Sequence, residues 1–284
     1  MNTQNRIIEL QNEYDMLRCQ CTSRILFNKA ENFGHIAFTF CVGSALSILL
    51  PDGTLSIFLP LVFDIFSVVF FSLLVVNQKK AAIIRNYFDD TVLGLKACSF
   101  DSGTIRMIFE TVTAEEKTNQ KKFREQINNT GRDNPPGVKN WYEFSKIFTE
   151  NEAVFECQKQ NLWWNKKLCK TRLAICSTIG IGTIVLILLT FFLFKNNRSK
   201  IIACVIGFII NISGQIKANY SYLHLSQELD NIASIPGISQ NPAQLLHLQK
   251  KIDSRRELPV LELNLLHKKN SKSYSESYAQ ISKY

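Results

Sequence analysis

Few residues in this 284-residue sequence have the types and spacing of a catalytic or metal site. The sequence has no H-E-x-x-H motif, no nucleophile elbow and no glycine loop that would hold a phosphate. Cys19 and Cys21 form one C-Q-C pair without a second pair or a histidine cluster, so we expect no metal site. We therefore predict a protein that is not an enzyme, with no catalytic residues and no cofactor.

Polar residues inside apolar stretches say more about function than the search for catalytic motifs does. Asp64 lies in the middle of an apolar stretch, and an ionised carboxylate at the centre of a bilayer costs about 2.5–3.5 kcal/mol. It is either a water-facing pore residue, the reading that we favour, or a hydrogen-bonded lock between helices. Asn211 and Gln215 lie on a small-and-polar helical stripe that serves either packing or a pore lining. Gly180 and Gly182 are expected at helix contacts.

Aromatic and basic residues also gather before the second apolar stretch. Trp141, Tyr142 and Trp164 lie near a run of cations that ends at Arg172. Because aromatic rings stack on bases and cations hold phosphates, these four are speculative ligand-binding residues for a nucleotide. The favoured alternative is an interfacial belt of aromatic and basic residues at the membrane surface.

Two apolar stretches, 33–76 and 173–216, must position these residues. Each divides at a short turn, which gives spans at 33–50, 55–76, 173–194 and 201–216. About 20 apolar residues cross a hydrocarbon core of about 30 Å, so the first and fourth spans are short. The sequence therefore predicts an all-α membrane protein, with four transmembrane helices as two hairpins and a helical cytosolic domain.

The remaining sequence divides around these hairpins. Residues 1–32 form a cytosolic amphipathic helix, 33–76 transmembrane hairpin 1, 77–172 a cytosolic sensor region, 173–216 transmembrane hairpin 2, and 217–284 a cytosolic helix and tail. Within the sensor region, Ile105, Ile108 and Val112 indicate a helix. The TAEE sequence at 113–116 has capping-box spacing before a helix at 117–128, and a long helix runs from about 151 into the third span.

The basic residues orient the chain. Thirty of the 33 Lys and Arg residues lie in the N-terminal arm, the middle region and the tail, and three lie in the turn at 195–200. Since cytoplasmic segments carry the excess of positive charge, we expect a multi-pass inner-membrane protein with both termini cytoplasmic. Isolated cysteines fit a reducing compartment, and the net charge of +9 also suits an anionic ligand.

Several segments together resemble one family of proteins. They are LQN at 10–12, RILFNKA at 24–30, FDDTVLGL at 88–95, WY at 141–142, CQKQNLWW at 157–164 and QKKIDSRRELP at 249–259. In their order and placement they resemble the SMODS-associating four-transmembrane (S-4TM) effectors of bacterial antiphage systems. The sequence departs from that pattern at Asn165 and Cys169, where the family usually has an acidic residue and an arginine.

The resemblance implies a membrane-disrupting, pore-forming effector that causes abortive infection. Its partners would be a cyclic oligonucleotide made by a partner nucleotidyltransferase, the lipid bilayer and further copies in a homo-oligomer, with no polymeric nucleic acid. The alternatives are a constitutive small-ion channel or transporter, a membrane-tethered enzyme and a scaffold with a basic cytosolic face. The meagre polar content of the spans disfavours transport, and the missing catalytic residues disfavour the enzyme.

Overall fold

The computed structural model describes residues 2–51, 53–193 and 198–260, and most of this part of the chain is helical. Beside the helices it contains one isolated bridge between Thr130 and Lys139. The predicted all-α class is confirmed for these residues. The helices are α1 (Thr3–Leu10), α2 (Tyr14–Leu46), η1 (Ser47–Leu49), α3 (Thr54–Leu93), α4 (Ser102–Thr118), α5 (Gln120–Asn128), α6 (Glu150–Leu193), α7 (Arg198–Ala233), η2 (Ile238–Gln240) and α8 (Pro242–Arg256).

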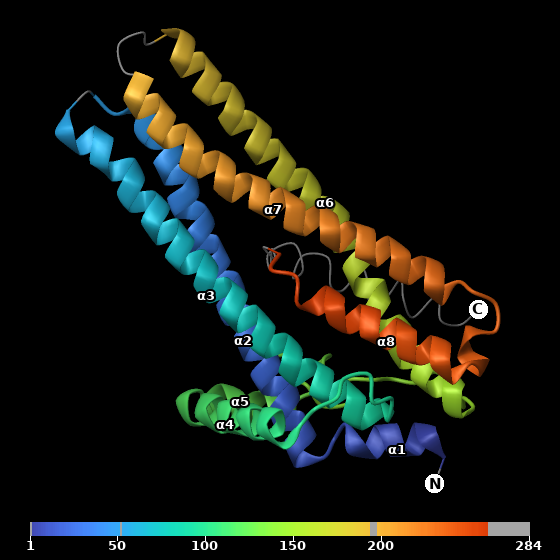
Figure 1. Ribbon diagram of the computed structural model, residues 1–284. Helices are drawn as coiled ribbons and strands as arrows, with labels where there is room; N and C mark the ends of the chain where they lie inside the picture. The colour runs from blue at the N-terminus through green and yellow to red at the C-terminus, as the bar shows by residue number, and fades with distance from the viewer. Residues whose placement is uncertain (1, 52, 194–197, 261–284) are drawn as a thin grey trace.

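Four long helices form two antiparallel pairs (Figure 1). Helices α2 and α3 lie side by side up to the turn after η1, and α6 lies beside α7. The α2/α3 turn, the end of α6 and the start of α7 are at one end of the molecule. At the opposite end α1, α4, α5 and α8 gather around the diverging pairs. Each long helix continues through a predicted domain boundary, since α6, for example, runs unbroken from Glu150 to Leu193.

Two details of the predicted helices are wrong. The N-terminal segment is two helices rather than one, because the chain turns between α1 and α2. The TAEE sequence does not cap a helix at 117: α4 continues through it to Thr118, and α5 starts at Gln120. The capping residue in this region is instead Asp101, directly before α4, whose carboxylate accepts a hydrogen bond of 2.6 Å from the Thr104 amide. Its apolar residues Ile108 and Val112 are buried as expected.

The end of α3 needs a glycine. Gly94 has φ +71°, a left-handed conformation that side chains disfavour, and a Cβ there would lie 2.7 Å from the Arg6 guanidinium. Arg6 Nη2 donates a 3.1 Å hydrogen bond to the Leu93 carbonyl, one of the acceptors that a helix end leaves open. This contact ties the N-terminal helix α1 to the end of α3.

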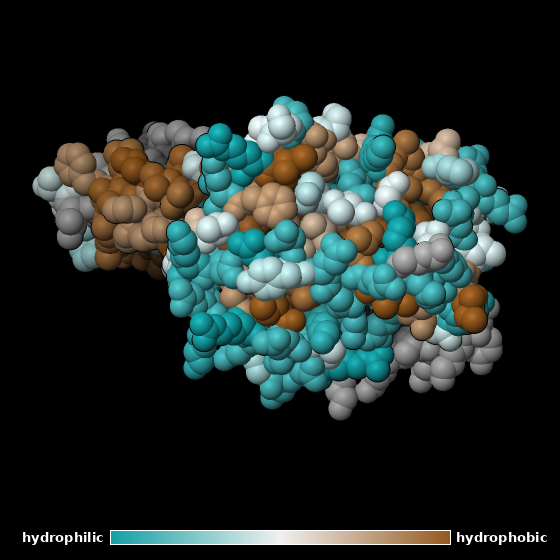
Figure 2. Space-filling model, turned by 90° about the horizontal axis from the view of Figure 1, so that it is seen from below, coloured by the Kyte–Doolittle hydropathy of each residue, from teal (hydrophilic) through white to brown (hydrophobic). Residues whose placement is uncertain are grey.

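The two ends of the molecule bury and expose different residues. The main hydrophobic core lies among α1, α4, α6, α8 and the ends of α2, α3 and α7, and includes Phe88, Val92, Cys157 and Leu248. Toward the turn end, apolar side chains face outward. We call this surface the apolar band; it comprises Phe58, Leu61, Val62, Ile65, Phe66, Val68, Val69, Leu73 and Val76 of α3 and Ile181, Ile184, Val185, Leu188, Leu189 and Phe192 of α6. Figure 2 shows hydrophobic surface gathered at one end beside a mainly hydrophilic body.

By length and composition, two helices of the described residues could cross a membrane. They are 14–49 and 58–93, and a shorter apolar helix covers Leu173–Val185.

Candidate functional site

Asp64 lies on α3 within the apolar band region and is half-buried. Ser44 of α2 lies near its carboxylate, and the Ser44 hydroxyl donates to the Pro60 carbonyl of α3 at 3.3 Å. The Oδ1 atom of Asp64 is buried and has no hydrogen-bond partner in the described part of the chain. This carboxylate therefore packs between α2 and α3, next to Cys41, with one oxygen unsatisfied.

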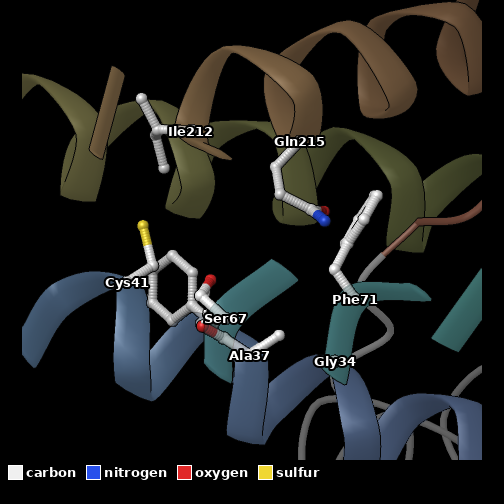
Figure 3. Close-up of a pocket in the computed structure, with 8 residues that line it drawn as sticks. Gly34, Ala37, Cys41, Ser67, Phe71, Ile212 and Gln215 are labelled. Atoms are coloured by element: carbon white, nitrogen blue, oxygen red, sulfur yellow. Dashed lines mark hydrogen bonds between the residues drawn. The ribbon is translucent and has the colours of Figure 1, made fainter. Parts of the chain in front are cut away.

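A small cavity lies between the α2/α3 pair and α7, and we call it the seam cavity (Figure 3). Its lining consists of Gly34, Ala37, Phe38, Cys41, Ser67, Phe71, Ile212 and Gln215. The Gln215 side chain points from α7 toward α2 and α3. Its Oε1 atom is buried and has no hydrogen-bond partner among the described residues. The Ser67 hydroxyl donates to the Ala37 carbonyl at 2.9 Å, which leaves the lone pairs of Ser67 Oγ directed elsewhere.

An apolar cluster adjoins the seam cavity on the side of the helix turns. Cys41 and Ala45 of α2 pack there against Phe208 and Ile212 of α7, all four of them buried. We call these four residues the apolar seal. Among the described side chains, this direct contact between α2 and α7 is made by apolar residues.

A buried polar cluster lies at the other end of the long helices, centred on Asp89 of α3. Tyr142 Oη donates to Asp89 Oδ1 at 2.7 Å, and Arg256 Nη2 donates to Asp89 Oδ2 at 2.5 Å. Arg85, one helical turn earlier, places its Nε 3.6 Å from Asp89 Oδ1. Asp89 itself is completely buried. We define the polar cluster as Arg85, Asp89, Tyr142, Asn161, Gln249, Asp253 and Arg256.

Further hydrogen bonds join this cluster to separate parts of the chain. Asn161 Nδ2 of α6 donates to Tyr142 Oη at 2.9 Å. Gln249 Nε2 of α8 donates to Asp253 Oδ1 at 2.9 Å. The Tyr142 backbone exchanges two hydrogen bonds with the Gln11 side chain at the end of α1, at 2.7 and 3.1 Å. The cluster therefore connects α1, α3, α6, α8 and the segment between α5 and α6.

The pKa values of the two carboxyl groups in the polar cluster, Asp89 and Asp253, shift in opposite directions. Burial works against the charge of Asp89, but the Arg256 and Arg85 guanidinium groups outweigh it and hold the pKa of Asp89 below its usual range. Burial raises the pKa of Asp253 to about 7; Asp89 adds to the rise and Arg256 opposes it. Burial also raises the pKa of the Tyr142 phenol, so Tyr142 stays neutral and donates. Asp253 is therefore the cluster's carboxyl that titrates near neutral pH.

The structure places the aromatic candidates differently from one another. Tyr142 is buried in the polar cluster, whereas Trp141 is 41% exposed and has the Arg85 guanidinium 4.4 Å from its ring centroid. The side chains of Trp164, Arg172 and Asn211 lie outside the described residues, although helices α6 and α7 pass through these positions. The structure thus brings Trp141 and Tyr142 to the polar cluster and Gln215 to the seam cavity.

The sequence analysis did not assign roles to Arg85, Asp89, Asp253 or Arg256. Charged residues three or four apart, at Arg85 with Asp89 and at Asp253 with Arg256, recur beside buried apolar positions of the same helices. This spacing is the signal that could have indicated two buried ion pairs. Their meeting across more than 160 residues could not be read from spacing alone.

Two kinds of reactive group were expected to be missing from this sequence, metal ligand sets and activated thiols. Among the described residues no group of three or more His, Cys, Asp and Glu could hold a metal ion. Burial raises the pKa values of Cys19 and Cys21 to about 12, so both thiols stay protonated and are poor nucleophiles.

A comparison with family models identifies the family of this chain. The model described as "SMODS-associating 4TM effector domain" matches residues 5–213, from α1 into α7. The match includes Asp64, Asp89 and Tyr142, while Gln215 and α8 follow it. Neither the comparison with curated proteins nor the comparison with solved structures found a significant match. Because the matched region covers most of the chain, the protein belongs to the SMODS-associating 4TM effector domain family.

Proposed function

We propose that this protein is a membrane effector of bacterial antiphage defence that disrupts the inner membrane after binding a cyclic oligonucleotide made by a partner nucleotidyltransferase. Copies of the chain assemble in the membrane, and the resulting leak arrests or kills the infected cell. The family match supports this class of function. The apolar band is the structural observation that carries the proposal.

The dimensions of the apolar band suit a bilayer. On α3 it runs from Phe58 to Val76, and 19 helical residues extend about 28 Å, close to the hydrocarbon thickness of about 30 Å. Exposed lysines follow directly at Lys79 and Lys80, where the helix would leave the lipid. Helix α6 contributes a shorter exposed apolar face, from Ile181 to Phe192. We infer that both helix pairs cross the bilayer as hairpins.

The polar cluster suits the transmission of a signal to these hairpins. It joins α3 and α6 to α1 and α8, and α3 and α6 continue without a break into the apolar band. A ligand that prefers one arrangement of the soluble end shifts the population of helix arrangements in the membrane. Trp141, with Arg85 against its ring, is our candidate stacking surface for the nucleotide, together with Tyr142, Trp164 and Arg172.

Expression with and without a cognate cyclase tests the proposal. We expect cells that express the protein alone to keep their membrane potential, and cells that also express an active nucleotidyltransferase to depolarise. A cyclase with its catalytic carboxylates replaced is the matched control. Depolarisation that is equally strong with the inactive cyclase would instead indicate a constitutive channel or transporter.

A further inference from the structure

The seam cavity contains a buried hydrogen-bond acceptor, Gln215 Oε1, that the described residues leave unpaired. Gln215 is only 9% exposed and points into the cavity (Figure 3), yet its Oε1 atom has no partner among the described residues. A buried acceptor left without a hydrogen bond costs about 1–3 kcal/mol. The cavity has a volume of about 20 Å³, which is room for about one water molecule.

Water fits this lining better than a lipid chain. Because the Ser67 hydroxyl gives its hydrogen to the Ala37 carbonyl, Ser67 Oγ remains an acceptor facing the cavity, as does Gln215 Oε1. A water molecule has two hydrogens to donate, one for each of these acceptors. A lipid chain would fill the space and leave both oxygens unpaired.

The apolar seal begins where the cavity ends. Cys41 and Ile212 belong to both, so one step along α2 or α7 leads from the polar cavity to the contact of Cys41 and Ala45 with Phe208 and Ile212. A constriction lined by apolar side chains stops conduction by excluding water, without a mechanical plug. On the opposite side of the cavity the two helix pairs diverge toward the soluble end (Figure 1).

We propose that the seam cavity binds water between Gln215 and Ser67, and that the apolar seal beside it is the contact that parts when the protein opens. Water already held at Gln215 then extends past Cys41 toward the turn end of the helices. The inference rests on the proposed function and adds where, within one chain, the passage through the membrane begins. It places that passage between α7 and the α2/α3 pair.

Reactivity of the native Cys41 tests the hydration of the seam without relying on activity. The other seven of the eight cysteines are replaced by serine, the membrane-embedded protein is treated with silver ions, which are about as small as a water molecule and replace the thiol proton, and the loss of free thiol is followed over time. The control is the cysteine-free chain with Val69→Cys, which lies in the apolar band on the outer face of α3, two residues from Ser67 of the seam cavity. Because only the thiolate reacts and it forms only where water reaches, we expect Cys41 to react at least about tenfold faster than the control.

The result expected for Gln215→Leu is the loss of this difference, since leucine offers no group to hold water. Equal rates for Cys41 and Val69→Cys in the unmodified seam would overturn the inference. This outcome is independent of whether any nucleotide permeabilises the membrane.

A disulfide across the seam tests the opening step. Ile212→Cys is combined with Cys41 and oxidised, which joins α7 to α2 through two residues of the apolar seal. The control pair, Phe40→Cys with Phe66→Cys in a chain that keeps Cys41, joins α2 to α3 through two neighbouring residues that line neither the seam cavity nor the apolar seal. Mass spectrometry of unreacted thiols verifies both bonds.

We expect the seam disulfide to abolish the cyclase-dependent leak, dithiothreitol to restore it, and the control disulfide to leave it unchanged. A full leak from the locked chain would overturn the inference. If the reduced chain also fails to leak with every cyclic oligonucleotide, the proposed function is wrong, and the Cys41 rates still decide whether the seam is hydrated.

Discussion

Asp89 shows how a buried charge is accommodated in this molecule. Its carboxylate is completely buried, and its partners come from its own helix α3, from the segment before α6 and from α8. A buried ion pair is weak evidence for stability, because desolvation offsets its attraction. Breaking it is nevertheless costly, so these contacts hold three distant segments in one arrangement.

Replacing partners of Asp89 should therefore destabilise the protein in a definite order. Arg256→Leu removes the closest cation and should cost about 3–5 kcal/mol, because the charge of Asp89 stays buried. Tyr142→Phe removes one hydroxyl and should cost about 1–3 kcal/mol. Thermal unfolding of the detergent-solubilised protein measures both. Lys250→Leu, at an exposed position of the same helix α8, is the control and should change little; an equal loss there would mean that helix α8 tolerates no change at all.

Asp253 should make stability depend on pH. Burial raises its pKa in the folded state from 3.8 to about 7, so the folded protein retains a proton that the unfolded chain has lost. The stabilisation that this proton gives the folded state is fully present below about pH 4. It falls by at most about 4 kcal/mol as pH rises to about 7, and it does not change further above that pH. Asp253→Asn should remove this slope, so its melting temperature relative to the native chain should rise between pH 5 and pH 7.5. Glu110→Gln, at an exposed carboxylate, should keep the native slope; the hypothesis fails if both variants behave alike.

Asp64 is either a water-facing pore residue or a lock between helices, and its surroundings in the structure bear on both roles. Its contact with Ser44 suits a lock between α2 and α3, whereas its unsatisfied Oδ1 suits a water-facing group. We expect Asp64→Leu to accumulate normally, since removing the carboxylate relieves desolvation, and to lower cyclase-dependent dye leakage severalfold. Ser72→Leu, at an exposed position of α3, is the control. Poor accumulation of Asp64→Leu alone would identify the lock.

At the scale of elements, the sequence predicted helices well and their ends poorly. Charge-free apolar runs determine where long helices lie, and α6 continues from the soluble end into its span as expected. The break after α1 escaped prediction because Gln11 binds the Tyr142 backbone, 131 residues away. Likewise, the capping-box spacing at Thr113 does not start a helix, because burial of Ile108 and Val112 stabilises α4, which continues through that segment. Tertiary contacts override local signals at such ends.

The two glycines expected at helix contacts differ in the structure, and a pair of substitutions exploits this. A Cβ at Gly180 would lie 3.2 Å from Ile212 Cγ1 of α7, while nothing lies within 4 Å of one at Gly182. Gly180→Leu should therefore separate α6 from α7 and cost about 1–3 kcal/mol. Gly182→Leu should be neutral or stabilising, because glycine disfavours a helix interior by about 1 kcal/mol. Melting temperatures of the two variants decide; a greater loss at Gly182 would contradict the α6/α7 packing.

At the scale of the whole molecule, the polarity of the two ends was predictable and their connection was not. Apolar runs, charge distribution and the resemblance indicated membrane and soluble parts, because each depends on composition along the chain. The polar cluster required Asp89 to meet Arg256, and the seam cavity required Gln215 to meet Ser67, pairs that no local pattern relates. The first meeting follows from the packing of α8 against α3, and the second from the packing of α7 against the α2/α3 pair.

The orientation of the chain in the membrane is the prediction on which the sensor hypothesis depends. The turn after α2 and the start of α7 lie at one end of the molecule, and the polar cluster lies at the other. With 30 of 33 basic residues outside the turns, the polar end should face the cytoplasm. In a cysteine-free chain, an impermeant maleimide added to spheroplasts should label Thr54→Cys and Ser199→Cys. It should label Ser102→Cys, at the start of α4, only after the membrane is opened. External labelling at Ser102→Cys would put the polar cluster outside the cell, where a nucleotide made in the cytoplasm could not reach Trp141.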